Sequence, residues 1–326
     1  MSRIQVGRGV IPRLYDDSRV LEIQHNPLGS LSFDPHIDTR ISTTIFWKTE
    51  VGTTVTTGTS HDFSYTPTAG PKTCQITVLA GLSEVSALDI GSDAVVSVNG
   101  LKKLTNATSF VANSNSSIQL DMKDLPPNLT TISLGSVFSL TGRIDDFPRS
   151  LTRAYLTNCI NLSGTINNLP SGMTLFRLTY APNVTGSISN LPSLLTDCQL
   201  AGCTGLSGSI NIMPTGLTIL SVNSALVTGS IDNLPNGLRT CDLAGCSQLT
   251  GTNVSHMAAI DFVYLQDQSA NVARVNGIVD NVYAAKATMH TAVTMDLGGN
   301  NATMDATQAA EVVTLEAAPY NWIITD

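Results

Sequence analysis

Apolar residues return at fixed positions about every 22 residues through the middle of the chain. Six consecutive segments align in one register, and the fifth is one residue shorter; they begin at Leu125, Phe147, Leu169, Leu191, Met213 and Leu234. Apolar residues occupy positions 1, 5, 8, 10, 13, 16 and 20 of a segment, and the second position is always proline. Fainter copies of positions 5, 8 and 10 occur at Val85, Ala107 and Ile260, so the pattern predicts nine structural repeats.

Positions 8 and 10 are apolar on both sides of a more polar ninth residue, as in Ile132-Ser133-Leu134. This period of two predicts a short strand in each repeat, with positions 8 and 10 directed inward and position 9 directed outward. The return half of each repeat ends at a proline and is too short for a helix of three turns, so we expect extended chain or a short second strand there. Stacked repeats of this kind form a parallel sheet.

The spacing L-x-x-L-x-L-x-x-(C/N)-x-x-L resembles that of the leucine-rich repeat family over residues 85–326. The resemblance implies a parallel β-solenoid over residues 81–270, capped at its end as solenoids require. Residues 271–326 read as helix, strand, helix and strand, and they resemble the α/β C-terminal cap of bacterial and phage leucine-rich proteins. The expected fold class is mainly β.

Residues 41–80 contain two β-rich runs joined by Thr/Gly turns. The candidates for the core of this segment are Trp47, Phe63, Tyr65, Ile76 and Val78. The runs "FWKTEVG" and "FSYTPTAGPKTCQITV" resemble the PKD-type immunoglobulin-like module, which implies a β-sandwich. Lys48-Thr49-Glu50 replaces the acidic-glycine turn of that family, so no role of the turn is carried over. Residues 1–40, which contain five arginines, match no family that we name and are interpreted as a docking arm.

Composition narrows the functional classes. Only 13% of the 326 residues are charged, the net charge is −8, and no Lys/Arg cluster occurs, which disfavours nucleic acid as a partner. No apolar run reaches 18 residues and the N-terminus lacks the apolar core of a signal peptide, so we expect neither membrane insertion nor export through such a signal.

Two cysteine pairs with the same spacing invite a metal, disulfide or redox interpretation. Cys198 and Cys241 occupy position 8 of the repeat, and Cys159, Cys203 and Cys246 occupy position 13. Other repeats hold Ile, Ala, Phe, Leu or Val at these inward positions, so the register favours buried apolar fillers.

No catalytic motif stands out in the chain. The alternating Asp34, His36 and Asp38 are compatible with a metal site, but such a pattern is more often a solvated strand edge. We find no nucleophile elbow, zinc-protease motif or phosphate-binding loop, so we predict no enzyme, no catalytic residue, no metal and no cofactor.

Outward positions 7 and 9 differ from repeat to repeat, as a recognition surface requires, although solvated sheet faces also vary freely. The candidate binding residues mix Arg, Tyr and apolar side chains, which are typical of interface hot spots. They are Arg153, Tyr155, Leu175, Arg177, Tyr180, Asp197, Gln199, Asp242, Phe262 and Tyr264.

An immunoglobulin-like module joined to repeats, with low charge and no signal peptide, resembles virion proteins of tailed bacteriophages. The resemblance implies a tail or capsid-surface adhesin that contacts other virion proteins through residues 1–80 and host surface glycan or protein through the solenoid. It implies assembly in the host cytoplasm and release by lysis, and it leaves homo-oligomerisation open. The alternative is a bacterial cell-surface or secreted leucine-rich adhesin.

Overall fold

The computed structural model is mainly β, with parallel-strand sheets and few helices. It describes residues 5–6, 9–10, 17–25, 34–64, 66, 70–91, 95–113, 118–224, 226–265, 272–289, 293–298, 306–317 and 323–325. Contacts divide the chain into a first unit, Met1–Thr141, and a second unit, Gly142–Asp326. The boundary therefore falls within the predicted repeats.

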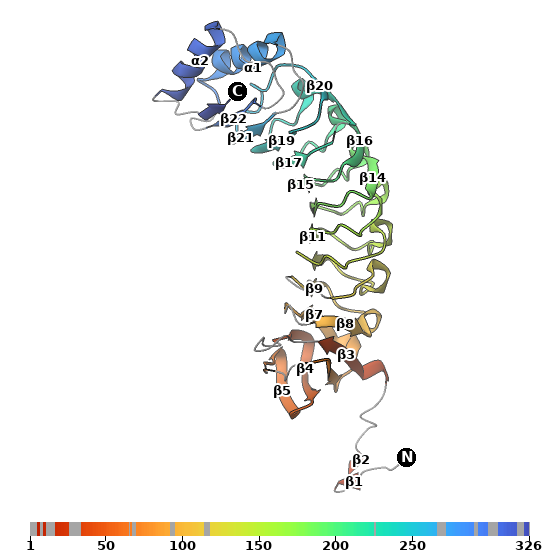
Figure 1. Ribbon diagram of the computed structural model, residues 1–326. Coiled ribbons are helices and arrows are strands. Elements are labelled where there is room, and N and C mark those ends of the chain that lie inside the picture. Colours follow the sequence, from red (N-terminus) through yellow and green to blue (C-terminus); the bar gives the residue numbers. More distant parts are fainter. Residues whose placement is uncertain are drawn as a thin grey trace. The chain divides into compact units, whose positions relative to one another are not determined.

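The second unit is built on a parallel sheet to which each repeat contributes one short strand (Figure 1). In spatial and chain order the strands are β11 (Arg153–Thr157), β13 (Leu175–Thr179), β15 (Asp197–Leu200), β17 (Ile219–Val222), β19 (Thr240–Asp242), β21 (Phe262–Tyr264), β22 (Thr294–Asp296) and β23 (Ile323–Thr325). Neighbouring strands pair without offset between equivalent positions, for example Phe176 with Cys198 and Cys198 with Leu220. The 22-residue spacing thus fixes the register.

The return half of these repeats forms a very short strand, a single 3-10 turn or, in most of them, one followed by the other. The strands are β12 (Gly164–Thr165), β14 (Val184–Ser187), β16 (Gly205–Ser209), β18 (Val227–Ser230) and β20 (Gln248–Thr250), and they pair in parallel. The turns are η5 (Ile144–Asp146), η6 (Ile166–Asn168), η7 (Ile188–Asn190), η8 (Ile210–Ile212) and η9 (Ile231–Asn233). The proline two residues after each turn is incompatible with a continuing helix.

Inward positions form continuous apolar ladders. Phe176 and Leu178 of β13 are fully buried, as are Cys198 and Leu200 of β15, which confirms the predicted alternation. Threonines at position 6 connect successive repeats: the Thr174 carbonyl accepts hydrogen bonds from the backbone N–H of Thr196 at 2.9 Å and from its Oγ1 at 3.0 Å. Each repeat is therefore held mainly by its two neighbours.

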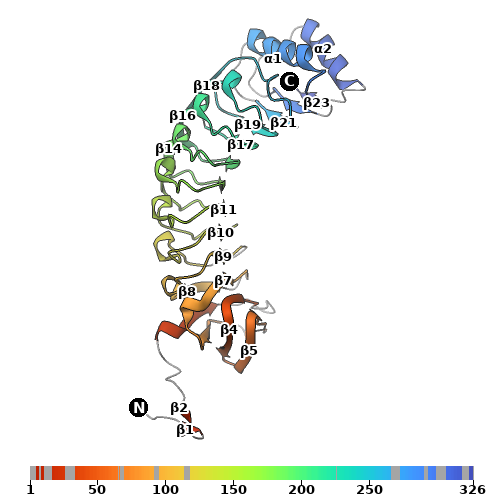
Figure 2. The same ribbon diagram turned by 180° about the vertical axis from the view of Figure 1, so that it is seen from behind.

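Two helices close the last strands of the second unit (Figure 2). They are α1 (Val272–Ala285) and α2 (Ala306–Glu316), which pack against each other, and α2 also contacts β23. One side of α1 is buried, and it consists of Val275, Ile278, Val279 and Val282. None of the helices in the described part of the chain is long and apolar enough to cross a membrane.

The first unit contains a mixed sheet. Its strand order is β8 (Val95–Asn99), β3 (Val20–His25), β6 (Lys72–Val78), β4 (His36–Thr49), β7 (Val85–Asp89), β9 (Ser109–Val111) and β10 (Thr131–Ser133), with β5 (Gly52–Asp62) paired to β4. The strands β7, β9 and β10 run parallel, whereas those from β3 to β6 and β8 pair antiparallel. Single 3-10 turns occur at η1 (Asp17–Arg19), η2 (Leu82–Glu84), η3 (Leu101–Lys103) and η4 (Met122–Asp124). A separate two-stranded antiparallel sheet is formed by β1 (Gln5–Val6) and β2 (Gly9–Val10).

The core of the antiparallel part is centred on Trp47. Its ring stacks on Phe63 at 4.9 Å between centroids, and both side chains are buried together with Ile76 and Val78. These core predictions are confirmed, while Tyr65 lies outside the described residues. Strand β3 falls within the segment that we interpreted as a docking arm, and it pairs with β6 over six residue pairs.

Candidate binding face

Two rows of outward side chains cross the parallel sheet of the second unit, and we call them together the outer face. The first row is Arg153, Leu175, Asp197, Ile219, Thr240 and Phe262, and the second is Tyr155, Arg177, Gln199, Ser221, Asp242 and Tyr264. Each residue lies opposite its equivalent in the next strand. Nine of the ten predicted binding residues therefore occupy one face, and Tyr180 follows the end of β13.

One end of the outer face carries an arginine–tyrosine cluster. The Tyr155 ring lies close to two guanidinium groups, 5.8 Å from Cζ of Arg153 and 5.6 Å from Cζ of Arg177. Arg153 also donates a hydrogen bond to the Tyr155 hydroxyl at 2.8 Å. These contacts orient the aromatic ring, and Arg153 remains exposed.

Side chains at the centre of the outer face form hydrogen bonds to one another. Asp197 is only 7% exposed because Arg177 donates to its two carboxylate oxygens from Nε at 3.1 and 3.3 Å and from Nη2 at 2.5 Å. Gln199 donates a further bond to Asp197 at 3.1 Å, and the pairing with Asp197 raises the pKa of Arg177. Asp197 therefore supports Arg177 rather than facing a ligand.

Asp242 is also engaged within the sheet. It accepts a hydrogen bond from Ser221 Oγ at 3.1 Å and another from the Ala244 N–H at 3.2 Å. Ser221 is itself buried. Asp242, which we predicted to face outward, therefore uses its carboxylate to accept hydrogen bonds from neighbouring residues of the protein.

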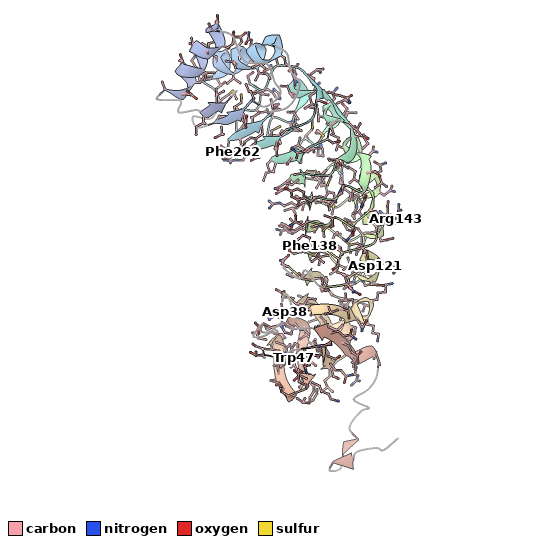
Figure 3. The ribbon with its side chains drawn as sticks, in the orientation of Figure 1. Asp38, Trp47, Asp121, Phe138, Arg143 and Phe262 are labelled. Carbon is pink, nitrogen blue, oxygen red and sulfur yellow. The ribbon has the colours of Figure 1, made fainter. Side chains whose placement is uncertain are left out.

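The other end of the face is apolar and exposed. Phe262 is 43% exposed, and Tyr264 next to it in the second row is half-buried. Figure 3 shows Phe262 on the side of the parallel sheet and Arg143 on the opposite side of the second unit. The open parts of the outer face are therefore its two ends.

Tyr180 is exposed by the backbone conformation after a strand, not by the alternation within one. It lies beyond β13 with a left-handed φ of 53°, and its side chain is 60% exposed. Gly202 of the next repeat lies so close that a Cβ there would be 3.0 Å from Tyr180 Cδ1.

Leu175, in the first row between Arg153 and Asp197, is half-buried.

Both rows continue further than we predicted. Thr294 and Asp296 of β22 extend them, and Ile323 of β23, which is 59% exposed, continues the first row. The alternation in "VTMDL" and "NWIITD" is the sequence signal for these positions, although it lacks the 22-residue spacing.

The cysteines are buried apolar fillers, as predicted. All six are free and buried. Burial raises the pKa of Cys159 to about 12 and those of Cys203 and Cys246 to about 11. Because the thiolate is the reactive form, these groups are poor nucleophiles and metal ligands at neutral pH.

His36 in the first unit contacts carboxylates through both ring nitrogens. Nδ1 lies 2.7 Å from Asp62 Oδ1, and Nε2 lies 3.0 Å from Asp38 Oδ1. Burial lowers the pKa of His36, but the hydrogen bonds and charges of Asp62 and Asp38 outweigh burial and raise it. Within the described residues, no group of three or more His, Cys, Asp or Glu is arranged to hold a metal ion.

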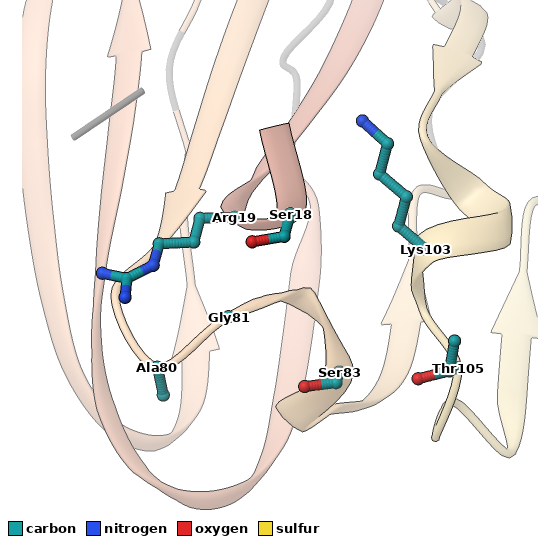
Figure 4. A pocket seen from close by; sticks show the side chains of 7 residues that line it. All are labelled: Ser18, Arg19, Ala80, Gly81, Ser83, Lys103 and Thr105. Carbon is teal, nitrogen blue, oxygen red and sulfur yellow. The ribbon is translucent and has the colours of Figure 1, made fainter. Parts of the chain in front are cut away.

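An open pocket of about 530 Å³ lies in the first unit (Figure 4). Its lining includes the cationic Arg19 and Lys103 and the hydroxyl groups of Ser18, Ser83 and Thr105. Figure 4 shows the Arg19 and Lys103 side chains extending in different directions, so the pocket does not focus their two charges on one point.

Compared with models of known protein families and with curated proteins, the chain matches none of them. The geometry of the outer face therefore carries the functional proposal.

Proposed function

We propose that this chain is a non-enzymatic binding protein, a virion protein of a tailed bacteriophage that presents the outer face to host surface glycan or protein. The observation that carries the proposal is the contrast between the two sides of each strand. Inward positions repeat as buried apolar residues, whereas outward positions change and leave Arg153 and Phe262 exposed and Tyr155 half-buried. Arg and aromatic side chains are the residue types that dominate binding energy at interfaces.

The architecture that supports this proposal is a leucine-rich-repeat solenoid over residues 81–270 with a cap over residues 271–326. Strands that repeat in parallel without offset favour it. An immunoglobulin-like assignment for residues 41–80 is favoured by β4, which pairs with β7 through His36–Thr39 and with β6 through Ile45–Lys48. The ladders of β4 also shift register after Asp38, and strands with such irregularities switch sheets at the corners of sandwiches. Residues 1–80 would then contact other virion proteins.

Binding to a panel of bacterial cells tests the function. The fluorescently labelled full chain should bind a subset of strains, and Arg153→Ala and Tyr155→Ala should each weaken binding about tenfold or more. Ile212→Ala is the control, because Ile212 is 70% exposed and lies in η8, outside both sheets. Equal binding by all variants, or no binding to any strain, would refute the proposal.

Two further experiments distinguish a glycan ligand from a protein ligand and a phage particle from a bacterial envelope. Competition by purified surface polysaccharide indicates a glycan, whereas loss of binding after protease treatment of the cells indicates a protein. An antibody against the chain should detect it in purified phage particles from the source culture. Detection in the cell envelope alone would favour the bacterial adhesin.

A further inference from the structure

The strand β5 in the first unit is an edge strand with an unusual composition. Among the described strands, β4 is its only pairing partner, and both views place β5 at the margin of the sheet (Figures 1 and 2). Residues Gly52–Gly58 pair with Thr43–Thr49 without interruption. An edge strand directs every second N–H and C=O group away from its neighbour, which makes it a template for another strand.

Natural edges are usually protected by charged residues, proline or bulges, and this stretch has none of these. Its sequence is Gly-Thr-Thr-Val-Thr-Thr-Gly, and five of the seven residues are exposed. Val55 at its centre is 51% exposed. The edge is therefore open along a run of seven residues.

The same seven residues read identically in both directions around Val55. We propose that β5 pairs antiparallel with β5 of a second copy of this chain, with the two-fold axis at Val55. Gly52 then lies opposite Gly58, Thr53 opposite Thr57, and Thr54 opposite Thr56 of the other copy. Each residue meets its own type, and no charged side chain lies within the pairing to repel the second copy.

Packing on both faces of the sheet favours this register. Phe46 lies opposite Val55 on the face that points away from the core, so the pairing aligns Phe46, Val55 and their two symmetry equivalents in one apolar row. Thr54 and Thr56 lie opposite Trp47 and Ile45 on the core side, and the pairing places threonines of the two copies side by side there. Aromatic–aliphatic and Thr–Thr cross-strand pairs both stabilise antiparallel sheets.

Thr56 is already positioned for this role. Its Oγ1 accepts a hydrogen bond from Trp47 Nε1 at 2.9 Å and lies 2.9 Å from His61 Nδ1. These contacts hold the middle of β5 in place before a second copy arrives, which lowers the ordering cost of association. The inference does not depend on the proposed function.

Sedimentation equilibrium of the full chain over a concentration series tests the pairing. A seven-residue ladder is small compared with interfaces of about 1,200–2,000 Å², so the series extends to the highest soluble concentration. The mass should rise from the 34.4 kDa of one chain toward twice that value. Val55→Lys places two like charges at the axis and should keep the protein monomeric, whereas Val51→Lys, at a 69% exposed valine outside the palindrome, should associate as the unchanged chain does.

A cross-linking variant locates the contact directly. Val55→Cys should form an intermolecular disulfide on mild oxidation at least tenfold faster than Val51→Cys, because only residue 55 meets itself across the axis. Circular dichroism should match between the paired variants, which separates lost pairing from lost folding. A monomeric unchanged chain, a Val55→Lys chain that still dimerises, or equal cross-linking of the two cysteine variants would overturn the inference.

Discussion

Gly186 provides a sharp test of the stacked repeats in the second unit. It precedes η7 with a φ of +117°, a conformation that an L-residue rarely adopts. A Cβ at this position would lie 2.6 Å from Thr165 Oγ1, 2.9 Å from Ile166 Cγ1 and 3.0 Å from Asn167 Oδ1. These atoms belong to the preceding repeat, so Gly186→Ala presses one repeat against the next.

The expected cost has two parts. Backbone strain at a sparsely populated φ costs about 1–3 kcal/mol, and overpacking costs about 1–3 kcal/mol more. The neighbours have little freedom to yield, because Thr165 Oγ1 caps η6 at 3.2 Å and Asn167 Oδ1 accepts from Ser187 N–H at 2.8 Å. We therefore expect Gly186→Ala to lower the free energy of unfolding by about 2–6 kcal/mol.

Urea unfolding monitored by circular dichroism measures this loss, with Gly216→Ala as the matched control. Gly216 has no positive φ, and the nearest atom to its added Cβ, the Leu195 carbonyl oxygen, is 3.9 Å away. The control should be neutral or slightly stabilising, because alanine restricts the unfolded chain. Equal unfolding midpoints for the two variants would refute the stacking geometry.

Two further predictions concern ion pairs. Arg177→Met should lower the free energy of unfolding by about 1–3 kcal/mol, because it removes the hydrogen-bonding cation from the buried Asp197 carboxylate. Arg153→Met, at an exposed arginine, is the control, and equal stability of both variants would contradict the pairing. His36 has a raised pKa, so its contribution to stability is present below the unfolded value near 6.5 and is lost as pH rises through the raised value. Urea unfolding should therefore show the difference between the unchanged chain and His36→Gln shrinking from pH 5.5 to 8.5, and a constant difference would exclude this role.

The alternation and the 22-residue spacing made the inward half of the repeats predictable. Positions such as Phe176 and Leu178 are buried because side chains alternate between the two faces of a strand, and because equal spacing places equivalent apolar residues of successive repeats next to one another. The cysteines followed from the same register. These inferences need only local periodicity, which a single sequence contains.

The accessibility of the outward residues was not predictable in the same way. The pattern places Asp197 outward, yet Arg177 from the neighbouring strand covers it. Long side chains reach across strands, and their rotamers depend on tertiary neighbours rather than on period. Strand β3 was missed for a related reason, since its partner β6 begins about fifty residues later and no local signal marks an antiparallel pairing at that distance.

A polar ladder on the return side was also missed, although its signal was present. Side-chain oxygens at one position of successive repeats accept the backbone N–H of the next repeat, as Asn167 does for Ser187 at 2.8 Å and Asn211 does for Ser230 at 2.8 Å. Asp232 does the same for Thr252 at 2.9 Å. An Asp or Asn that returns with the repeat three residues after a glycine indicates such an acceptor.

These ladders separate stability from recognition within the second unit. Apolar fillers, threonine carbonyls and Asp or Asn acceptors join each repeat to the next, and all of them lie inside the sheet or on its return side. Outer-face residues contribute to stability where their side chains pair across strands, as Arg177 does with Asp197 and Ser221 does with Asp242. Arg153, Tyr155 and Phe262 lie outside these contacts, so, under the proposed function, substitutions there should change binding while the fold is retained.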